Sequence, residues 1–305
     1  MLAVEIPAII LSIFIFVYFA LNRQACTKLK NHGWLILLLV NFFQLILNLP
    51  MPMSYYYMNY IWPPTNTYCV WWTWCEFSLN GIGLFLMAWI SIERHLIIFH
   101  SHTMLQTRWK KWTFHFIPIV FCLIWAPLLF FILVVLSPLC TTLWDFNLFL
   151  CGFPCYYAEK FLNQFDFIFN LFLPVMIIIL SNVALVIRVI YQKMSRQQAI
   201  NWRRHRKMVL QLWIVSSLYM GFWLPVTITL FIQITILPSF MTDQLEAMQF
   251  AAYFIPLLLP VICLSTLPEL VKKIMEIISI RQMNVIGIVS YNQNTVQTAT
   301  IPTIA

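Results

Sequence analysis

Charged residues are scarce in this sequence: they make up 9% of its 305 residues, whereas soluble domains usually contain about 25%. Hydrophobic residues, in contrast, account for 62% of the chain. So few charges exclude an ordinary soluble domain, which needs a hydrated surface around its apolar interior. The composition therefore predicts a polytopic membrane protein with the lipid bilayer as its main surroundings.

The sequence also lacks the motifs of several functional classes. It has no His-Glu-x-x-His motif and no paired nucleophile and base, so we expect no enzymatic activity, no cofactor and no metal site. It shows no internal repeat, and an odd number of hydrophobic segments does not divide into matched halves as in many transporters. It contains no Asn-x-Ser/Thr glycosylation sequon either.

Seven apolar segments are long enough to cross a bilayer, which takes about 20 residues each. They span Leu2 to Leu21, Trp34 to Met58, Val70 to Phe99, Phe114 to Leu136, Phe161 to Ile190, Met208 to Leu237 and Leu245 to Leu267. Only helices and closed barrels satisfy backbone hydrogen bonds in lipid, and these runs lack the alternation of barrel strands. We therefore expect an all-α fold, a bundle of seven transmembrane helices.

The lysines and arginines predict the orientation of this bundle. All of them except Lys160 fall on one side, and basic loops are retained in the cytoplasm. The N-terminus is thus expected to be extracellular and the C-terminus cytoplasmic, in the plasma membrane. The run that follows Met1 to Glu5 lacks a basic n-region and a cleavage site, so we expect a first helix rather than a signal peptide. The formal net charge of +8 follows from this topology, and no nucleic-acid partner is predicted.

The third apolar segment carries two acidic side chains, one near each end. Glu76 lies near its outer end, and Glu93 precedes Arg94 at its inner end. Glu76 and Arg94 are separated by five whole helical turns, so both point to one side of the helix, about 27 Å apart. An unpaired carboxylate inside a membrane costs roughly 2.5 kcal/mol or more. We therefore expect Glu76 to face a wet cavity or a cation.

Four sequence features then occur in a fixed order. They are Cys69; Glu93-Arg94-His95, whose arginine follows that cysteine by 25 residues; Phe222-Trp223-Leu224-Pro225; and Pro260, 35 residues after Pro225. In this order and spacing, over Leu2 to about Ile280, they resemble the motifs of rhodopsin-like (class A) G-protein-coupled receptors. The resemblance implies an extracellular small-molecule or peptide ligand and a cytoplasmic heterotrimeric G protein. The residues it implies in coupling and activation are Glu93, Arg94, His95, Trp223, Pro225 and Pro260.

The resemblance also implies a receptor domain over residues 1–280. Within it, residues 268–280 set apolar side chains against Lys272, Lys273 and Glu276, a pattern typical of a short amphipathic eighth helix on the inner leaflet. Residues 281–305 are rich in Asn, Gln and Thr and are expected to form a disordered cytoplasmic tail.

Four positions depart from the family pattern. The Asn-Pro-x-x-Tyr motif keeps only its proline, with Leu259 and Cys263 in place of its asparagine and tyrosine. The acid of the second helix is Asn41, and the tyrosine of the fifth helix is Asn182. These changes remove polar contacts with which the family stabilises its active state. We therefore expect a divergent, orphan-like member whose signalling efficiency and basal activity differ from those of the family.

The resemblance assigns Cys69 to a disulfide with the second extracellular loop. That loop contains Cys140, Cys151 and Cys155 here. We expect Cys69 to pair with Cys151 or Cys155, and Cys140 with the remaining cysteine. The alternative is that the three loop cysteines stay free thiols.

Glu76, Asp166 and Tyr253 are expected to converge below this loop, because each falls in the outer third of its helix. In amine-binding relatives the position of Glu76 holds an acid that binds the ligand's ammonium group, with a tyrosine at the position of Tyr253 and a tryptophan at that of Trp72. The resemblance thus implies a pocket that accepts a cation, either an amine or the basic terminus of a peptide. Two alternatives remain open. Glu76 is bonded to Tyr253 or protonated and meets no ligand, or Glu76 and Asp166 form the coupling-ion or proton site of a transporter.

Overall fold

The computed structural model describes residues 2–22, 29–104, 109, 112–136, 140–194 and 199–265. Met1–Ile262 form one compact unit that contains nearly all of these residues. Cys263–Ala305 form a second unit, of which only residues 263–265 are described. The amphipathic helix expected at 268–280 and the tail expected at 281–305 lie outside the described residues.

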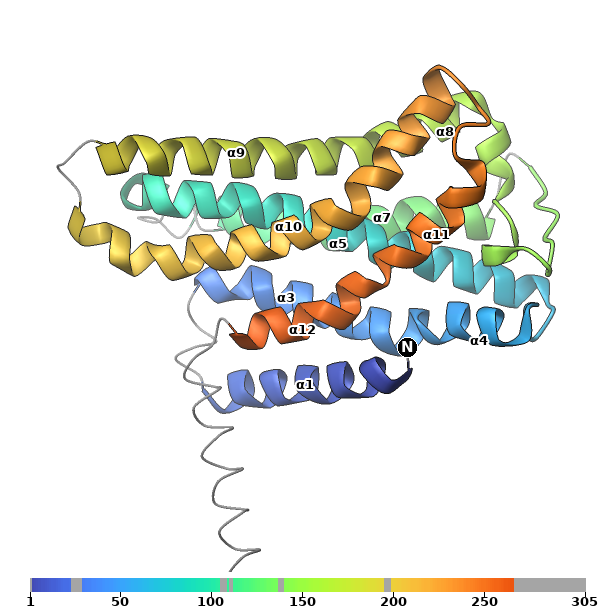
Figure 1. Ribbon diagram of the computed structural model, residues 1–305, viewed down its shortest axis with the longest axis horizontal. Helices are drawn as coiled ribbons and strands as arrows, with labels where there is room; N and C mark the ends of the chain where they lie inside the picture. Colours follow the sequence, from blue (N-terminus) through green and yellow to red (C-terminus); the bar gives the residue numbers. More distant parts are fainter. Residues whose placement is uncertain are drawn as a thin grey trace, which may run out of the picture. The chain divides into compact units, whose positions relative to one another are not determined.

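The prediction of seven membrane-spanning helices in an all-α bundle is confirmed (Figure 1). The described residues contain no strand. In chain order the spans are α1 (Leu2–Leu21); α3 (Leu29–Phe43) with a π-helical turn (Gln44–Asn48) and α4 (Pro50–Met58); α5 (Asn66–Met104); a π-helical turn (Trp112–Phe116) with α7 (Ile117–Phe130) and a second π-helical stretch (Phe131–Leu136); α8 (Lys160–Asp166) with a π-helical stretch (Phe167–Phe172) and α9 (Leu173–Met194); α10 (Ala199–Thr235); and α11 (Thr242–Ala252) with α12 (Phe254–Ser265).

The third span, α5, is the central helix of the bundle. It packs against α3, α7, α9 and α10. In its most apolar window 67% of the residues are buried, compared with 33% to 50% in the other spans. Polar side chains on α5 therefore face other helices more often than lipid, which is where they can act together with groups from the rest of the bundle.

Prolines interrupt two of the spans. In the second span a π-helical turn precedes Pro50, whose ring nitrogen cannot donate to the preceding turn of the helix. In the seventh span the helix breaks at Tyr253, within the turn whose hydrogen bonding Pro256 disrupts. The carbonyl oxygen of Pro256 accepts a hydrogen bond of 2.9 Å from the side-chain amide of Asn41. Asn41 therefore ties the second span to the seventh.

The close approach of α5 to α7 depends on Gly81. A Cβ atom at this position would lie 2.8 Å from the Cβ of Ala126, an atom held by backbone on a neighbouring helix. We expect Gly81→Ala to lower the free energy of unfolding by about 1 to 2 kcal/mol, because the two helices must separate. The thermal midpoint of the purified protein in detergent measures this effect.

Gly221→Ala is the matched control for this prediction. A Cβ atom at Gly221 would have nothing within 4 Å, so the substitution should leave the midpoint unchanged or raise it slightly, as expected for alanine in a helix. Equal midpoints for the two variants would contradict the assignment of Gly81 as a packing position.

Candidate functional site

A cavity opens between α5, α7, the start of the fifth span, α10 and α11. It contains about 850 Å³ of space not filled by atoms, a figure that includes space open to the outside. The polar side chains that line it are those of Glu76, Asn80, Tyr157, Asn163, Asp166, Asn170 and Gln249. Two of these residues are acidic, and none of the lining residues is a lysine, arginine or histidine.

Glu76 enters the cavity from α5 and is 7% exposed. Its Oε2 accepts a hydrogen bond of 2.5 Å from the hydroxyl of Tyr253, and its Oε1 accepts one of 2.5 Å from the amide of Asn80. The carbonyl oxygen of the Asn80 side chain accepts a bond of 2.8 Å from Gln44. Gln44 thereby fixes which end of the Asn80 amide faces the carboxylate.

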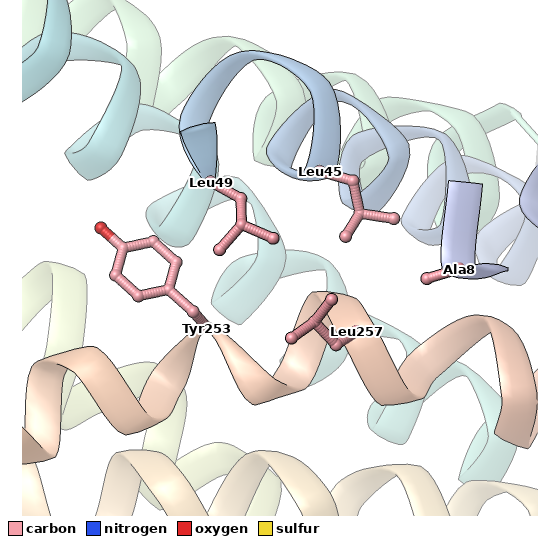
Figure 2. Close-up of a cluster of buried hydrophobic side chains, with 5 residues drawn as sticks. All are labelled: Ala8, Leu45, Leu49, Tyr253 and Leu257. Atoms are coloured by element: carbon pink, nitrogen blue, oxygen red, sulfur yellow. The ribbon is translucent and has the colours of Figure 1, made fainter. Parts of the chain in front are cut away.

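Tyr253 reaches Glu76 from the helix break between α11 and α12. Its ring packs in a cluster of buried apolar side chains made by Ala8, Leu45, Leu49 and Leu257. Figure 2 shows the hydroxyl pointing away from Ala8 and Leu257, at the far end of the ring. Glu76 and Tyr253, which the sequence predicts to converge, are in direct contact. The cluster holds the ring of Tyr253 while its hydroxyl donates to the carboxylate.

Asp166 enters the same cavity from the end of α8 and is 8% exposed. Its Oδ2 accepts a hydrogen bond of 3.0 Å from the hydroxyl of Tyr156, and its Oδ1 accepts one of 2.7 Å from the amide of Asn170. The indole N–H of Trp125 on α7 donates to the other end of that amide over 3.0 Å. Burial, together with the neighbouring Tyr157 and Asp166, raises the pKa of Tyr156 well above its ordinary value. The hydroxyl therefore stays protonated and able to donate.

The two carboxylates are held in the same way. Each is followed four residues later, one helical turn on, by an asparagine that donates to it, and each also accepts from a tyrosine of another part of the chain. All of these donors are neutral. A carboxylate away from water is stabilised most by a positive charge, and the lining residues supply none. The geometry can therefore accept a cation at either carboxylate.

The loop between the fourth and fifth spans covers the cavity. The structure has disulfides Cys69–Cys151 and Cys140–Cys155, which is one of the pairings left open by the sequence. Phe149 and Leu150, next to Cys151, line the cavity. Trp72 packs edge-on against Phe149 and is fully buried in the cluster around the first disulfide. Trp72, which the resemblance implied as a ligand-binding residue, is thus packed against the loop and is not among the lining residues.

The opposite end of α5 carries Glu93, Arg94 and His95. Arg94 is only 2% exposed, and its guanidinium lies 5.8 Å from the ring centroid of Trp34. The carboxylate of Glu93 is hydrogen-bonded to Nδ1 of His115, in the π-helical turn before α7. Nε2 of His115 lies 3.1 Å from Nδ1 of His32 on α3. Glu93, His115 and His32 therefore link three spans, and no spacing in the sequence connects these residues.

The remaining predicted residues lie between the two ends or beside them. Trp223 on α10 lines the cavity, and Pro225 follows two residues later on the exposed side of that helix. Pro260 is buried within α12, and His95 is half-buried. The structure thus brings Glu76, Asp166 and Trp223 to the cavity. Tyr253 is not among the lining residues and contacts Glu76 instead, and Arg94 and its neighbours lie at the far end of α5.

Comparison with known families is consistent with this arrangement. The family described as 7 transmembrane receptor (rhodopsin family) matches residues 12–264. No curated protein matches the chain. The match favours a receptor over a transporter, and receptors of this family are generally not enzymes. The seven apolar helices make the chain a multipass membrane protein. Because the match covers most of the sequence, the chain belongs to the rhodopsin family of seven-transmembrane receptors.

Proposed function

We propose that this receptor binds an extracellular ligand with a cationic group, an amine or a basic peptide terminus, and activates a heterotrimeric G protein at the plasma membrane. The observation that supports this proposal is the carboxylate of Glu76. It lies in the cavity of a receptor, accepts only neutral donors, and has no basic residue among the lining side chains. The basic loops on the other side favour an extracellular position for the cavity.

Signalling requires a change at the far end of α5. Arg94 is buried in this conformation, so a G protein cannot contact its guanidinium. Trp223 lines the cavity and lies two residues before Pro225, where α10 lacks a hydrogen-bond donor and can bend. We infer that ligand contact at Trp223 favours a bent α10 and an exposed Arg94. The ligand must then bind the open state better than the closed one.

We infer supporting roles in coupling and activation for three further residues. Glu93 and His95 flank Arg94 on α5, and Pro260 lies within the seventh span, whose Tyr253 contacts Glu76. Glu93, His95 and Pro260 belong to this proposal as coupling and activation residues. The transporter alternative, with Glu76 and Asp166 as an ion site, is not favoured by the family match.

G-protein activation in cells tests the proposal. Wild type, Arg94→Ala, Trp223→Ala and Glu76→Gln are expressed at matched surface levels with reporters for each G-protein class, and exposed to amines and basic peptides. We expect Arg94→Ala to reduce the signal at least about tenfold, since a charge-assisted contact of this kind contributes more than about 1.4 kcal/mol. Glu76→Gln should remove the response to cationic ligands, and Trp223→Ala should weaken it.

Trp213→Ala is the matched control for Trp223→Ala. Trp213 lies on the same helix but is 53% exposed on its outer face, so its removal should leave the signal unchanged. A wild-type chain at the surface that activates no reporter with or without ligand, or an unchanged signal in Arg94→Ala, would overturn the proposal.

A further inference from the structure

The cavity is lined by two separate carboxylates, whereas a ligand with a single cation needs only one. Glu76 comes from α5, and Asp166 comes from the end of α8, at the start of the fifth span. Both line the same space. A ligand with one positive charge at Glu76 would leave the carboxylate of Asp166 without a cationic partner from the lining residues.

Each carboxylate has its own set of supporting side chains. Glu76 is held by Tyr253 and by Asn80, which Gln44 orients. Asp166 is held by a set with no member in common, namely Tyr156, Asn170 and Trp125. The two sets hold the two carboxylates separately, and both acidic residues line the cavity. This arrangement suits two binding points rather than one shared charge.

The wall of the cavity is largely apolar, with both aromatic and aliphatic side chains. Phe77, Phe130, Phe167 and Trp223 line it together with aliphatic side chains such as Leu84. Aromatic faces attract cations and pack well against hydrocarbon. A ligand that places a cation at each carboxylate would thus have an apolar segment against this wall.

We propose that the site takes a dication, two ammonium groups joined by an apolar spacer, with one group at Glu76 and the other at Asp166. This inference rests on the proposed cationic ligand and makes its chemistry specific. A free diamine and a peptide that begins with lysine share this chemistry, because both carry two ammonium groups on a short chain.

Binding of amines of matched length to the purified full chain tests the inference. The probes are α,ω-diamines from 1,4-diaminobutane to 1,8-diaminooctane, the n-alkylamines of the same lengths, and lysine amide as the peptide counterpart. Thermal stabilisation of the protein in detergent reports binding without requiring a G protein. In wild type we expect the best diamine to bind at least about tenfold more tightly than the monoamine of the same length.

Variants of the two carboxylates separate the two binding points. In Asp166→Asn the diamines should bind no better than monoamines, while the monoamine affinity stays within about threefold. Glu76→Gln should weaken both kinds of amine. Asp166→Glu keeps the charge on a longer arm and should shift the preference toward a shorter diamine, which a merely misfolded variant would not do. Asp243→Asn, at an exposed acid in the first turn of α11, should change nothing.

The possible outcomes distinguish this inference from the proposal on which it rests. If monoamines bind through Glu76 and diamines bind no more tightly, the dication is wrong and the single cation stands. The same conclusion follows if Asp166→Asn weakens both kinds of amine equally. If neither kind of amine binds wild type, both the dication and the cationic ligand are wrong. Tight binding of lysine amide but not of the free diamines would identify a peptide terminus as the source of the dication.

Discussion

Replacing Cys69 and Cys151 together by serine should remove most of the receptor from the cell surface and abolish ligand binding in what remains. The disulfide joins residues that are 82 positions apart. For a loop of this length the chain-entropy contribution reaches about 4.5 kcal/mol. That figure is an upper bound here, since lipid already restrains the helices at both ends of the loop.

The local backbone adds a second reason for a large effect. Leu150, Cys151 and Gly152 have φ angles of 56°, 58° and 82°, in the left-handed region that costs a residue other than glycine about 1 to 3 kcal/mol. The disulfide to Cys69 and the hydroxyl of Thr73, 3.5 Å from the Leu150 carbonyl oxygen, hold this turn against α5. Without the disulfide the turn can relax, and Leu150 then leaves the wall of the cavity.

The pair Cys140 and Cys155 is the matched control, because it is the other disulfide of the same loop. Its residues are 15 positions apart and only half-buried. The double serine variant should keep most of its surface expression, with a thermal midpoint above that of the first variant. Surface labelling and thermal midpoints measure both variants. If the Cys140 and Cys155 variant lost more expression than the Cys69 and Cys151 variant, the larger contribution expected of the Cys69–Cys151 disulfide would be wrong.

The seven spans could be predicted because a long run of apolar residues is enough to identify a membrane-spanning helix. The first was predicted with the same bounds as α1, Leu2–Leu21. The ends of some other spans were not predicted correctly. α5 begins at Asn66 and α10 begins at Ala199, several residues before the apolar runs that predicted them. A hydrophobic run marks the part of a helix in lipid, whereas hydrogen bonding continues the helix into polar sequence beyond it.

The acidic residues of the site could also be predicted, because a carboxylate in an apolar segment is rare and expensive. Glu76 and Asp166 were found in this way. The asparagine one turn after each acid was visible in the sequence as well, since residues four apart share a helix face. Tyr156 and Trp125 could not be predicted as partners. Their contacts join a loop or a different helix to the fifth span, and only tertiary packing decides such contacts.

At the other end of α5, His115→Ala should lower the free energy of unfolding by about 3 kcal/mol. The carboxylate of Glu93 is buried and hydrogen-bonded to His115. Removing the hydrogen-bond partner of a buried charged group leaves that group unsatisfied, which costs about 3 kcal/mol or more. The nearby Arg94 compensates part of this loss, which places the expected value at the lower end.

The other oxygen of the Glu93 carboxylate lies close to α3. A Cβ atom at Gly33 would lie 3.5 Å from Oε2 of Glu93 and 3.0 Å from the side chain of Ile90, so the backbone of α3 closes against α5 here. Nδ1 of His32 lies within hydrogen-bond distance of Nε2 of His115. His32→Ala should therefore cost less than His115→Ala, about 1 kcal/mol, the usual contribution of one hydrogen bond.

A double-mutant cycle separates the pair from the packing of the imidazole ring. His115→Ala, Glu93→Gln and the double variant are compared by the thermal midpoints of the purified chains. If the hydrogen bond to Glu93 accounts for the effect of His115→Ala, that effect should shrink once Glu93→Gln has removed the carboxylate. His115→Ala should then cost about 1 to 3 kcal/mol less in the Glu93→Gln background than in wild type. If His115→Ala costs the same with either residue at position 93, the histidine acts by filling space, and Glu93 does not depend on it.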